Sequence, residues 1–187
     1  MTGALALAST LLLSACTSSS GNGVDLGYVA GDGSVKTWDA GDRGDAVTLV
    51  GKDFEGTTID TSDYRGDVVV VNTWYASCAP CRKEAPDLAK EAAAAGSDVH
   101  FVGINSTDDA GAAQAFQRTF DIPYPSIADK DGSVVATLQG VVPVQAVPTT
   151  VILDQEGRVA ARVLGATTAT TLDDLIDDVR TAPTAGS

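Results

Sequence analysis

Four consecutive valines, Val68–Val71, lie within the run Asp67–Thr73 and constrain the fold more than any other feature of the sequence. A continuous β-branched stretch is typical of a strand that is buried on both faces of a sheet. Helix-forming residues follow over Ala79–Ala95, and Gly96 ends that segment. We therefore expect a central buried strand that leads directly into a long helix.

The other segments alternate between strand and helix patterns. Val47–Val50 and Thr57–Ile59 predict an N-terminal hairpin. After the first helix, the patterns predict a strand, a helix, a strand, a short helix, two antiparallel strands and a last helix, over Val99–Ile104, Ala110–Phe120, Ser126–Ala128, Ser133–Leu138, Thr149–Leu153, Val159–Leu164 and Leu172–Val179. This order predicts an α/β, thioredoxin-like fold with an N-terminal β-hairpin and an inserted αβ element between the first helix and the strand that begins at Thr149.

The length of 187 residues fits one domain with additional ends. We place the thioredoxin-like domain at residues 46–182 and a C-terminal tail at residues 183–187. Within residues 16–45, Thr17–Gly23 contains only small polar residues and predicts a flexible tether. Val24–Asp45 is rich in Gly and Asp, and we expect it to be irregular and to lie on the surface.

The segment Cys78-Ala79-Pro80-Cys81 lies between the buried strand and the long helix. Unsatisfied amides at a helix N-terminus favour a thiolate, so Cys78 is the expected nucleophile. The spacing places Cys81 one turn further into the helix. From there it is shielded, yet it can attack a mixed disulfide on Cys78 and release the reduced substrate.

A CxxC segment can also serve in a zinc site or as a structural disulfide. A four-coordinate structural zinc site would have to include several carboxylate ligands, because no second cysteine pair exists and His100 is the only histidine. A purely structural disulfide is the other alternative, but so short a loop stabilises a fold weakly. We expect a redox pair with no metal and no cofactor. His100 lies in a predicted strand and is assigned no role.

A second candidate element, Val147-Pro148-Thr149, lies immediately before a predicted strand. A cis-proline at Pro148 would present backbone groups beside the cysteine pair, where a substrate chain could pair with them. Taken alone, a proline before a strand is usually only a turn. The proposed role of Pro148 therefore depends on its combination with the CxxC segment.

The charge balance limits the possible partners. Twenty-five acidic and twelve basic residues give a net charge of −13. This charge repels a phosphate backbone, so we do not expect nucleic acid as a partner.

The N-terminus predicts export and membrane attachment. Residues 1–15 contain no charge, and their apolar stretch Ala4–Leu13 is too short to cross a bilayer, so they are predicted to be a signal peptide. Leu13-Ser14-Ala15-Cys16 resembles the lipobox of bacterial lipoproteins, in which the cysteine is acylated after cleavage. An incidental cysteine behind an apolar end is the alternative. If Cys16 is lipidated, the other two cysteines form the redox pair, and each of the three cysteines has a role.

The longer block Asn72–Pro86 resembles the active-site block of the TlpA/ResA-like thiol-disulfide oxidoreductases, a redoxin family of thioredoxin fold. Two later blocks, Val147–Thr150 and Asp154–Gly157, are also similar to that family, and the resemblance spans about Val47–Val179. It implies thiol-disulfide exchange outside the cytoplasm by a membrane-tethered protein.

The resemblance also implies a role for Glu84. In that family a glutamate at this place tunes the cysteines and can relay protons, and burial would raise its pKa. The alternative is an exposed helix carboxylate beside Arg82 and Lys83. One position departs from the family, which often has Trp directly before the first cysteine, where this chain has Ser77.

The predicted function is reduction of protein disulfides at the extracytoplasmic face of the cell membrane, with apocytochrome c among the clients and a membrane thiol protein as electron donor. Disulfide-containing or dithiol proteins are thus the expected partners. An oxidant of secreted proteins would carry the same motifs and differ in the relative stability of dithiol and disulfide. A copper metallochaperone is the less favoured alternative, because such proteins use a longer cysteine spacing and a downstream histidine. A peroxidase is also less favoured, because it would use a differently placed cysteine.

Overall fold

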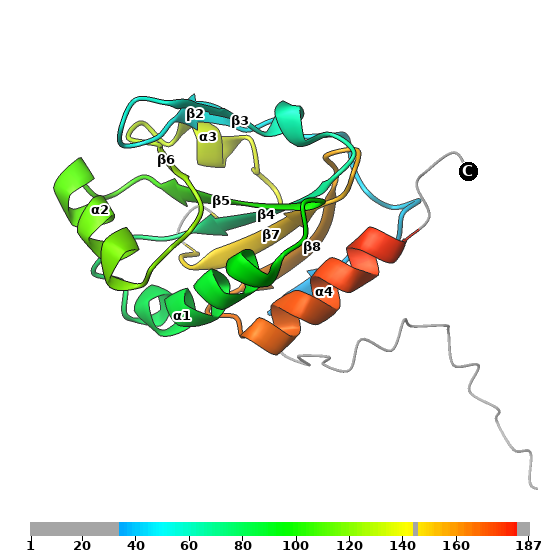
Figure 1. Cartoon of the computed structure of the whole chain (residues 1–187). Coiled ribbons are helices and arrows are strands. Elements are labelled where there is room, and N and C mark those ends of the chain that lie inside the picture. The colour runs from blue at the N-terminus through cyan, green and yellow to red at the C-terminus, as the bar shows by residue number, and fades with distance from the viewer. Residues whose placement is uncertain (1–33, 144–145, 183–187) are drawn as a thin grey trace, which may run out of the picture.

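The computed structural model describes residues 34–143 and 146–182, and a mixed β-sheet forms its centre (Figure 1). Its strands lie in the order β1-β8-β7-β4-β5-β6. Their bounds are β1 Val35–Thr37, β4 Val68–Thr73, β5 Val99–Asn105, β6 Ser126–Ala128, β7 Thr149–Leu153 and β8 Val159–Leu164. Strands β4, β5 and β6 are parallel, whereas β7 is antiparallel to β4, β8 to β7 and β1 to β8.

Helices cover both faces of this sheet. The remaining elements are the hairpin strands β2 Val50–Lys52 and β3 Thr58–Asp60, the 3-10 helix η1 Thr61–Tyr64, and the helices α1 Ala79–Ala94, α2 Ala110–Thr119, α3 Ser133–Ala136 and α4 Ala169–Thr181. Figure 1 shows α1 and α4 side by side on one face of the sheet, and the β2–β3 hairpin with α3 on the other.

The valines of β4 bury both faces of the sheet, as their sequence predicts. Val68 and Val70 pack in the core that includes Leu88 of α1 and Leu172 of α4. Val69 and Val71 pack in the opposite core, beneath the hairpin and α3. All four valines are at most 1% exposed. The central strand therefore joins two apolar layers and fixes the position of the turn that follows it.

The predicted thioredoxin-like fold is confirmed. The hairpin is present, although its first strand begins at Val50, where the predicted segment ends. Helix α1 connects the parallel strands β4 and β5, and α2 with β6 forms the predicted inserted element before β7. The long helix, the antiparallel pair β7–β8 and the last helix lie where the sequence predicts them.

The prediction that Val24–Asp45 is irregular is wrong for Val35–Thr37. These residues form the edge strand β1, which pairs with β8 from Val35 opposite Val163 to Thr37 opposite Ala161. The strand has only three residues, and the surrounding sequence is rich in Gly and Asp, so the sequence gives no strand signal here. Its pairing is decided by the free edge of β8, which is a tertiary effect.

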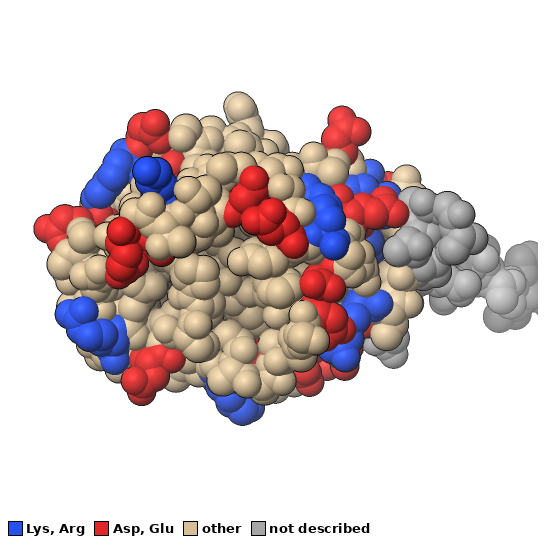
Figure 2. Space-filling view, turned by 45° about the horizontal axis from the view of Figure 1, so that its top comes forward, with Lys and Arg blue, Asp and Glu red and all other residues tan. Residues whose placement is uncertain are grey.

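Several predictions fall outside the described residues: the signal peptide at 1–15, Cys16 with its lipobox, the tether, and the tail at 183–187. Within the described ranges, no helix is both long enough and apolar enough to cross a bilayer. Figure 2 shows acidic and basic side chains interspersed on one face of the molecule, with uncharged surface between them.

Candidate active site

The two cysteines of the CxxC segment lie where the chain passes from β4 into α1. Cys78 is the N-cap of α1, and its sulfur accepts a hydrogen bond from the backbone N–H of Cys81 at 3.1 Å. Cys78 and Cys81 are joined by a disulfide bond. The first amides of a helix lack intrahelical partners and lie at its positive end. In the dithiol form, this position favours a thiolate on Cys78.

The disulfide lies just beneath the surface. Cys78 is 2% and Cys81 1% exposed, whereas Ser77, Ala79 and Pro80 around them are exposed. Below the sulfurs lies a small apolar cluster of Trp74, Ala85, Ala113 and Phe116. Trp74 stacks on Phe116 with ring centroids 4.4 Å apart, and its indole N–H donates to Ser126 at 3.2 Å. Trp74 after β4, together with side chains of α1 and α2, thus provides an apolar layer beneath the disulfide.

Pro148 lies in the loop that enters β7, next to β4 in the sheet. The Val147–Pro148 peptide bond is cis. The hydroxyl of Thr73, at the end of β4, accepts from the backbone N–H of Thr149 at 2.9 Å, which ties the two strand ends together. Val147 packs against the apolar cluster that contains both cysteines. The fold thus brings Pro148 to the same edge of the sheet as the disulfide.

Glu84 is buried beneath α1 and is only 1% exposed, so it is not the exposed helix carboxylate of the alternative interpretation. One carboxylate oxygen, Oε1, accepts from Asn72 Nδ2 at 2.9 Å, and the other, Oε2, accepts from the backbone N–H of Thr167 at 2.9 Å. Burial raises the pKa of Glu84 to about 7, against the opposing effect of these two donors. This carboxyl group therefore titrates near neutral pH, as a proton donor and acceptor would.

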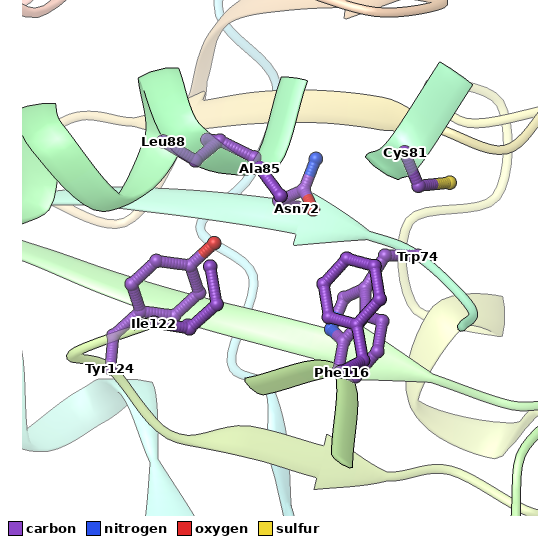
Figure 3. Close-up of a pocket in the computed structure, with 8 residues that line it drawn as sticks. All are labelled: Asn72, Trp74, Cys81, Ala85, Leu88, Phe116, Ile122 and Tyr124. Carbon is purple, nitrogen blue, oxygen red and sulfur yellow. The ribbon is translucent and has the colours of Figure 1, made fainter. Parts of the chain in front are cut away.

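A small cavity of about 10 Å³ lies between Cys81 and Tyr124 (Figure 3). That volume is close to the least that holds one water molecule. Figure 3 shows the Tyr124 hydroxyl directed towards α1, at Ala85 and Leu88. Burial, and to a smaller degree the Glu84 carboxylate, raise the pKa of Tyr124 above its usual value. Tyr124 therefore stays a neutral phenol.

Sequence reasoning missed Asn72, Thr167 and Tyr124. Asn72 did carry a signal, because it is a polar residue at the end of an otherwise apolar strand and must find a partner when buried. Its side chain also donates to Thr150 Oγ1 at 3.2 Å. Thr167 contributes to Glu84 only a backbone N–H, which no side-chain pattern marks.

His100 is remote from the disulfide. Its ring lies 2.9 Å from an Asp67 carboxylate oxygen and stacks on Tyr64, with ring centroids 4.1 Å apart. Among residues 34–143 and 146–182, no group of three or more His, Cys, Asp or Glu side chains could hold a metal ion.

Comparison with known proteins places this site in a family. Residues 41–162 match the model of the AhpC/TSA family. The chain belongs to the AhpC/TSA family. The thiol-disulfide oxidoreductase ResA of Bacillus subtilis is 29% identical over 143 residues, which are 76% of this chain and 78% of ResA.

Two solved structures are similar to this chain in both fold and sequence. A DsbF homologue from Corynebacterium diphtheriae has a TM-score of 0.70 at 32% identity, over 81% of this chain and 96% of that one. A secreted thiol-disulfide isomerase from Corynebacterium glutamicum has a TM-score of 0.71 at 34% identity, over 80% and 96% of the two chains. Together with the Cys78–Cys81 disulfide, these relatives identify the chain as a thiol-disulfide oxidoreductase with a ResA-like thioredoxin fold.

Proposed function

We propose that this thiol-disulfide oxidoreductase reduces disulfides in client proteins outside the cytoplasm, with Cys78 as nucleophile and Cys81 as resolving thiol. The observation that carries the proposal is the position of Cys78 as N-cap of α1, bonded to Cys81, above the buried carboxyl group of Glu84.

The reaction has two exchange steps. The Cys78 thiolate attacks one sulfur of the client disulfide, so that a mixed disulfide forms and one client thiolate leaves. Cys81 then loses its proton and attacks Cys78 Sγ, so that the Cys78–Cys81 disulfide forms and the second client thiolate leaves. The client gains two electrons and this chain loses two. Glu84, with a pKa of about 7, is the proposed acceptor of the Cys81 proton.

The reducing direction is supported by the surroundings of the sulfurs. An ionised Glu84, three residues after Cys81 on α1, and the apolar cluster of Trp74 and Phe116 oppose the effect of the helix N-terminus and disfavour a thiolate. They withhold from the dithiol form the thiolate stabilisation on which strong oxidants depend. A less stable dithiol form is the better reductant, whereas strong oxidants stabilise their reduced form. ResA is named a thiol-disulfide oxidoreductase and the C. glutamicum protein a thiol-disulfide isomerase, and neither name states a direction.

Pro148 is the proposed position at which the client chain is held. Its loop lies at the sheet edge beside the disulfide, and Val147 contacts the cysteine cluster. Backbone groups there could pair with an extended client segment. Apocytochrome c is the proposed client on the basis of resemblance to ResA-like proteins, and a membrane thiol protein is the proposed electron donor.

We also propose that a lipid on Cys16 holds the domain at the outer face of the cell membrane. The lipobox residues support this location, and the relative from C. glutamicum is a secreted protein. Fractionation of cells that express the full chain tests it. Wild type should sediment with membranes. Cys16→Ser should not be acylated and should therefore not sediment with them. Detection of an unmodified Cys16 in the exported wild-type protein would contradict the anchor.

The proposed reaction is tested with the full chain in its dithiol form and a disulfide-bonded model protein. Stoichiometric loss of the client disulfide, with formation of the Cys78–Cys81 disulfide, is expected. If the client keeps its disulfide while the oxidised chain converts client dithiols to disulfides, the chain is an oxidant instead.

A further inference from the structure

The turn before Cys78 is held by two side chains of opposite charge. The backbone N–H of Ala76 donates to Asp108 Oδ2 at 2.6 Å, and the carbonyl of Ala76 accepts from Arg82 Nη1 at 3.2 Å. We propose that Asp108 and Arg82, which bind the two sides of the Ala76 backbone, form a charge clamp that positions Cys78. The negative charge of Asp108 and the positive charge of Arg82 have opposite effects on the stability of the Cys78 thiolate. The inference rests on the proposed role of Cys78 as nucleophile.

The side chain of Asp108 is held in place by hydrogen bonds other than its bond to the turn. It lies in the loop after β5, and its Oδ2 also accepts from Asn105 Nδ2 at 2.8 Å. The side-chain oxygen Oδ1 of Asn105 in turn accepts from the backbone N–H of Asp108 at 2.9 Å, and Asn105 is fully buried. Lys130 reaches the carbonyl oxygens of Thr107 and Asp108. This bonding places a carboxylate at a defined point beside the turn.

Arg82 is fixed from the other side. It follows Cys81 in the first turn of α1 and is exposed. Its guanidinium lies over the rings of Phe120 and Phe116 of the α2 region, 5.0 and 6.0 Å from their centroids. Such cation–π contacts hold an exposed arginine in one orientation. The positive charge of Arg82 is thereby kept at the turn, opposite Asp108.

Both charges lie close in the structure to Cys78, because Ala76 precedes it by two positions and Cys78 begins α1. An anion disfavours a nearby thiolate and a cation favours it. Several ionisable side chains lie on the segments that meet at this turn: Tyr75 before it, Cys81, Arg82, Lys83, Glu84, Asp87, Lys90 and Glu91 on α1, Asp108 and Asp109 before α2, Arg118 on α2, and Lys130. Of these, Asp108 and Arg82 bond directly to the turn.

Two variants that each remove one charge, of which Asp108→Asn is nearly isosteric, separate a field effect from simple loosening of the turn. Asp108→Asn keeps an acceptor for Ala76 but removes the negative charge, so the thiolate-to-thiol ratio of Cys78 should rise at fixed pH. Arg82→Gln removes the positive charge, so the same ratio should fall. Each change should be about two- to fivefold, the range expected for partly exposed charges. In the double variant, the thiolate-to-thiol ratio of Cys78 should return towards the wild-type value.

The measurement is the pH dependence of alkylation of Cys78 in the full chain in its dithiol form, with the modified cysteine identified by mass spectrometry. Lys83→Gln is the control, because it removes an exposed positive charge next to Arg82 that makes no described hydrogen bond to the turn. Its effect should be smaller than that of Arg82→Gln.

Opposite shifts that compensate in the double variant support the clamp. Shifts in the same direction, or no shift, in variants that still reduce the model client overturn the clamp and leave the proposed function standing. A wild-type Cys78 that is not alkylated while Cys81 is modified would overturn the role of Cys78, and with it both proposals.

Discussion

Glu84 and Asn72 are joined by a 2.9 Å hydrogen bond from the Asn72 amide nitrogen to Glu84 Oε1, beneath the helix that carries both cysteines. Both residues are at most 2% exposed. Strand β4 supplies the amide and α1 supplies the carboxyl group, so the bond links the central strand to the redox helix. The pKa of about 7 makes this link sensitive to pH near neutrality.

The first prediction concerns stability and pH. The pKa of Glu84 is raised from 4.5 to about 7 by folding, so the folded chain binds the extra proton between these values and stability falls as pH rises through that window. The total loss is on the order of 3 kcal/mol. Glu84→Gln should abolish this slope. Urea denaturation of both proteins at pH 5 and pH 8 measures it, and parallel pH profiles would contradict the assignment.

The second prediction concerns Asn72. Asn72→Ala leaves the Glu84 carboxylate with the backbone N–H of Thr167 as its remaining described donor, so the free energy of unfolding above pH 7 should fall by about 1–3 kcal/mol. The loss should be smaller at pH 5, where Glu84 is protonated. In the background of Glu84→Gln the pH dependence of the effect should vanish. A loss that is equal at both pH values in the wild-type background would mean that Asn72 acts through packing alone.

The third prediction separates the two thiols. Cys78→Ser should abolish client reduction, because no nucleophile remains at the N-cap of α1. Cys81→Ser should instead accumulate a mixed disulfide between Cys78 and the client, because the second exchange step is missing. Non-reducing electrophoresis with peptide mass mapping detects the adduct. Normal turnover by Cys81→Ser would show that the roles are assigned wrongly.

The fourth prediction concerns a buried ion cluster far from the sulfurs. Asp154, after β7, pairs with Arg43 and Arg158 at 2.9 Å each, and its side chain is 2% exposed. Asp154→Ala leaves two largely buried guanidinium groups without this partner and should destabilise the fold by about 3–5 kcal/mol, with the reduction potential unchanged.

Arg180→Ala is the matched control for that variant. Arg180 pairs with Asp98 at 3.4 Å, but both side chains are about half exposed. Its loss should cost less than about 1 kcal/mol. Similar unfolding midpoints for the two variants would show that the buried cluster contributes no more than a surface pair.

Much of the fold follows from local sequence. The valines of β4 define the central strand through burial on both faces, and the alternation of later segments defines the βαβ order. Strand β1 could not be predicted this way, because Val35–Thr37 becomes a strand only where β8 offers an unpaired edge. Local β-propensity does not predict a strand that forms only through tertiary pairing.

The candidate site was predictable where its residues are neighbours in the sequence. Cys78, Cys81 and Glu84 lie at the N-terminal end of α1. Their spacing and the family resemblance therefore indicate all three as site residues. Asp108 and Thr167 reach the site from distant loops, and Thr167 does so through its backbone N–H. Such contributions depend on how the loops meet in space, which one sequence does not define.

If Cys78 and Cys81 reduce protein disulfides, the reduction potential of this pair must be low. The full chain is equilibrated in thiol buffers and followed by the fluorescence of Trp74, which packs in the cluster with both sulfurs, whereas Trp38 packs in a separate core. A single two-electron transition with a midpoint near or below about −250 mV is expected. A midpoint near about −120 mV would mark an oxidant, and the absence of any transition would contradict redox function at this pair.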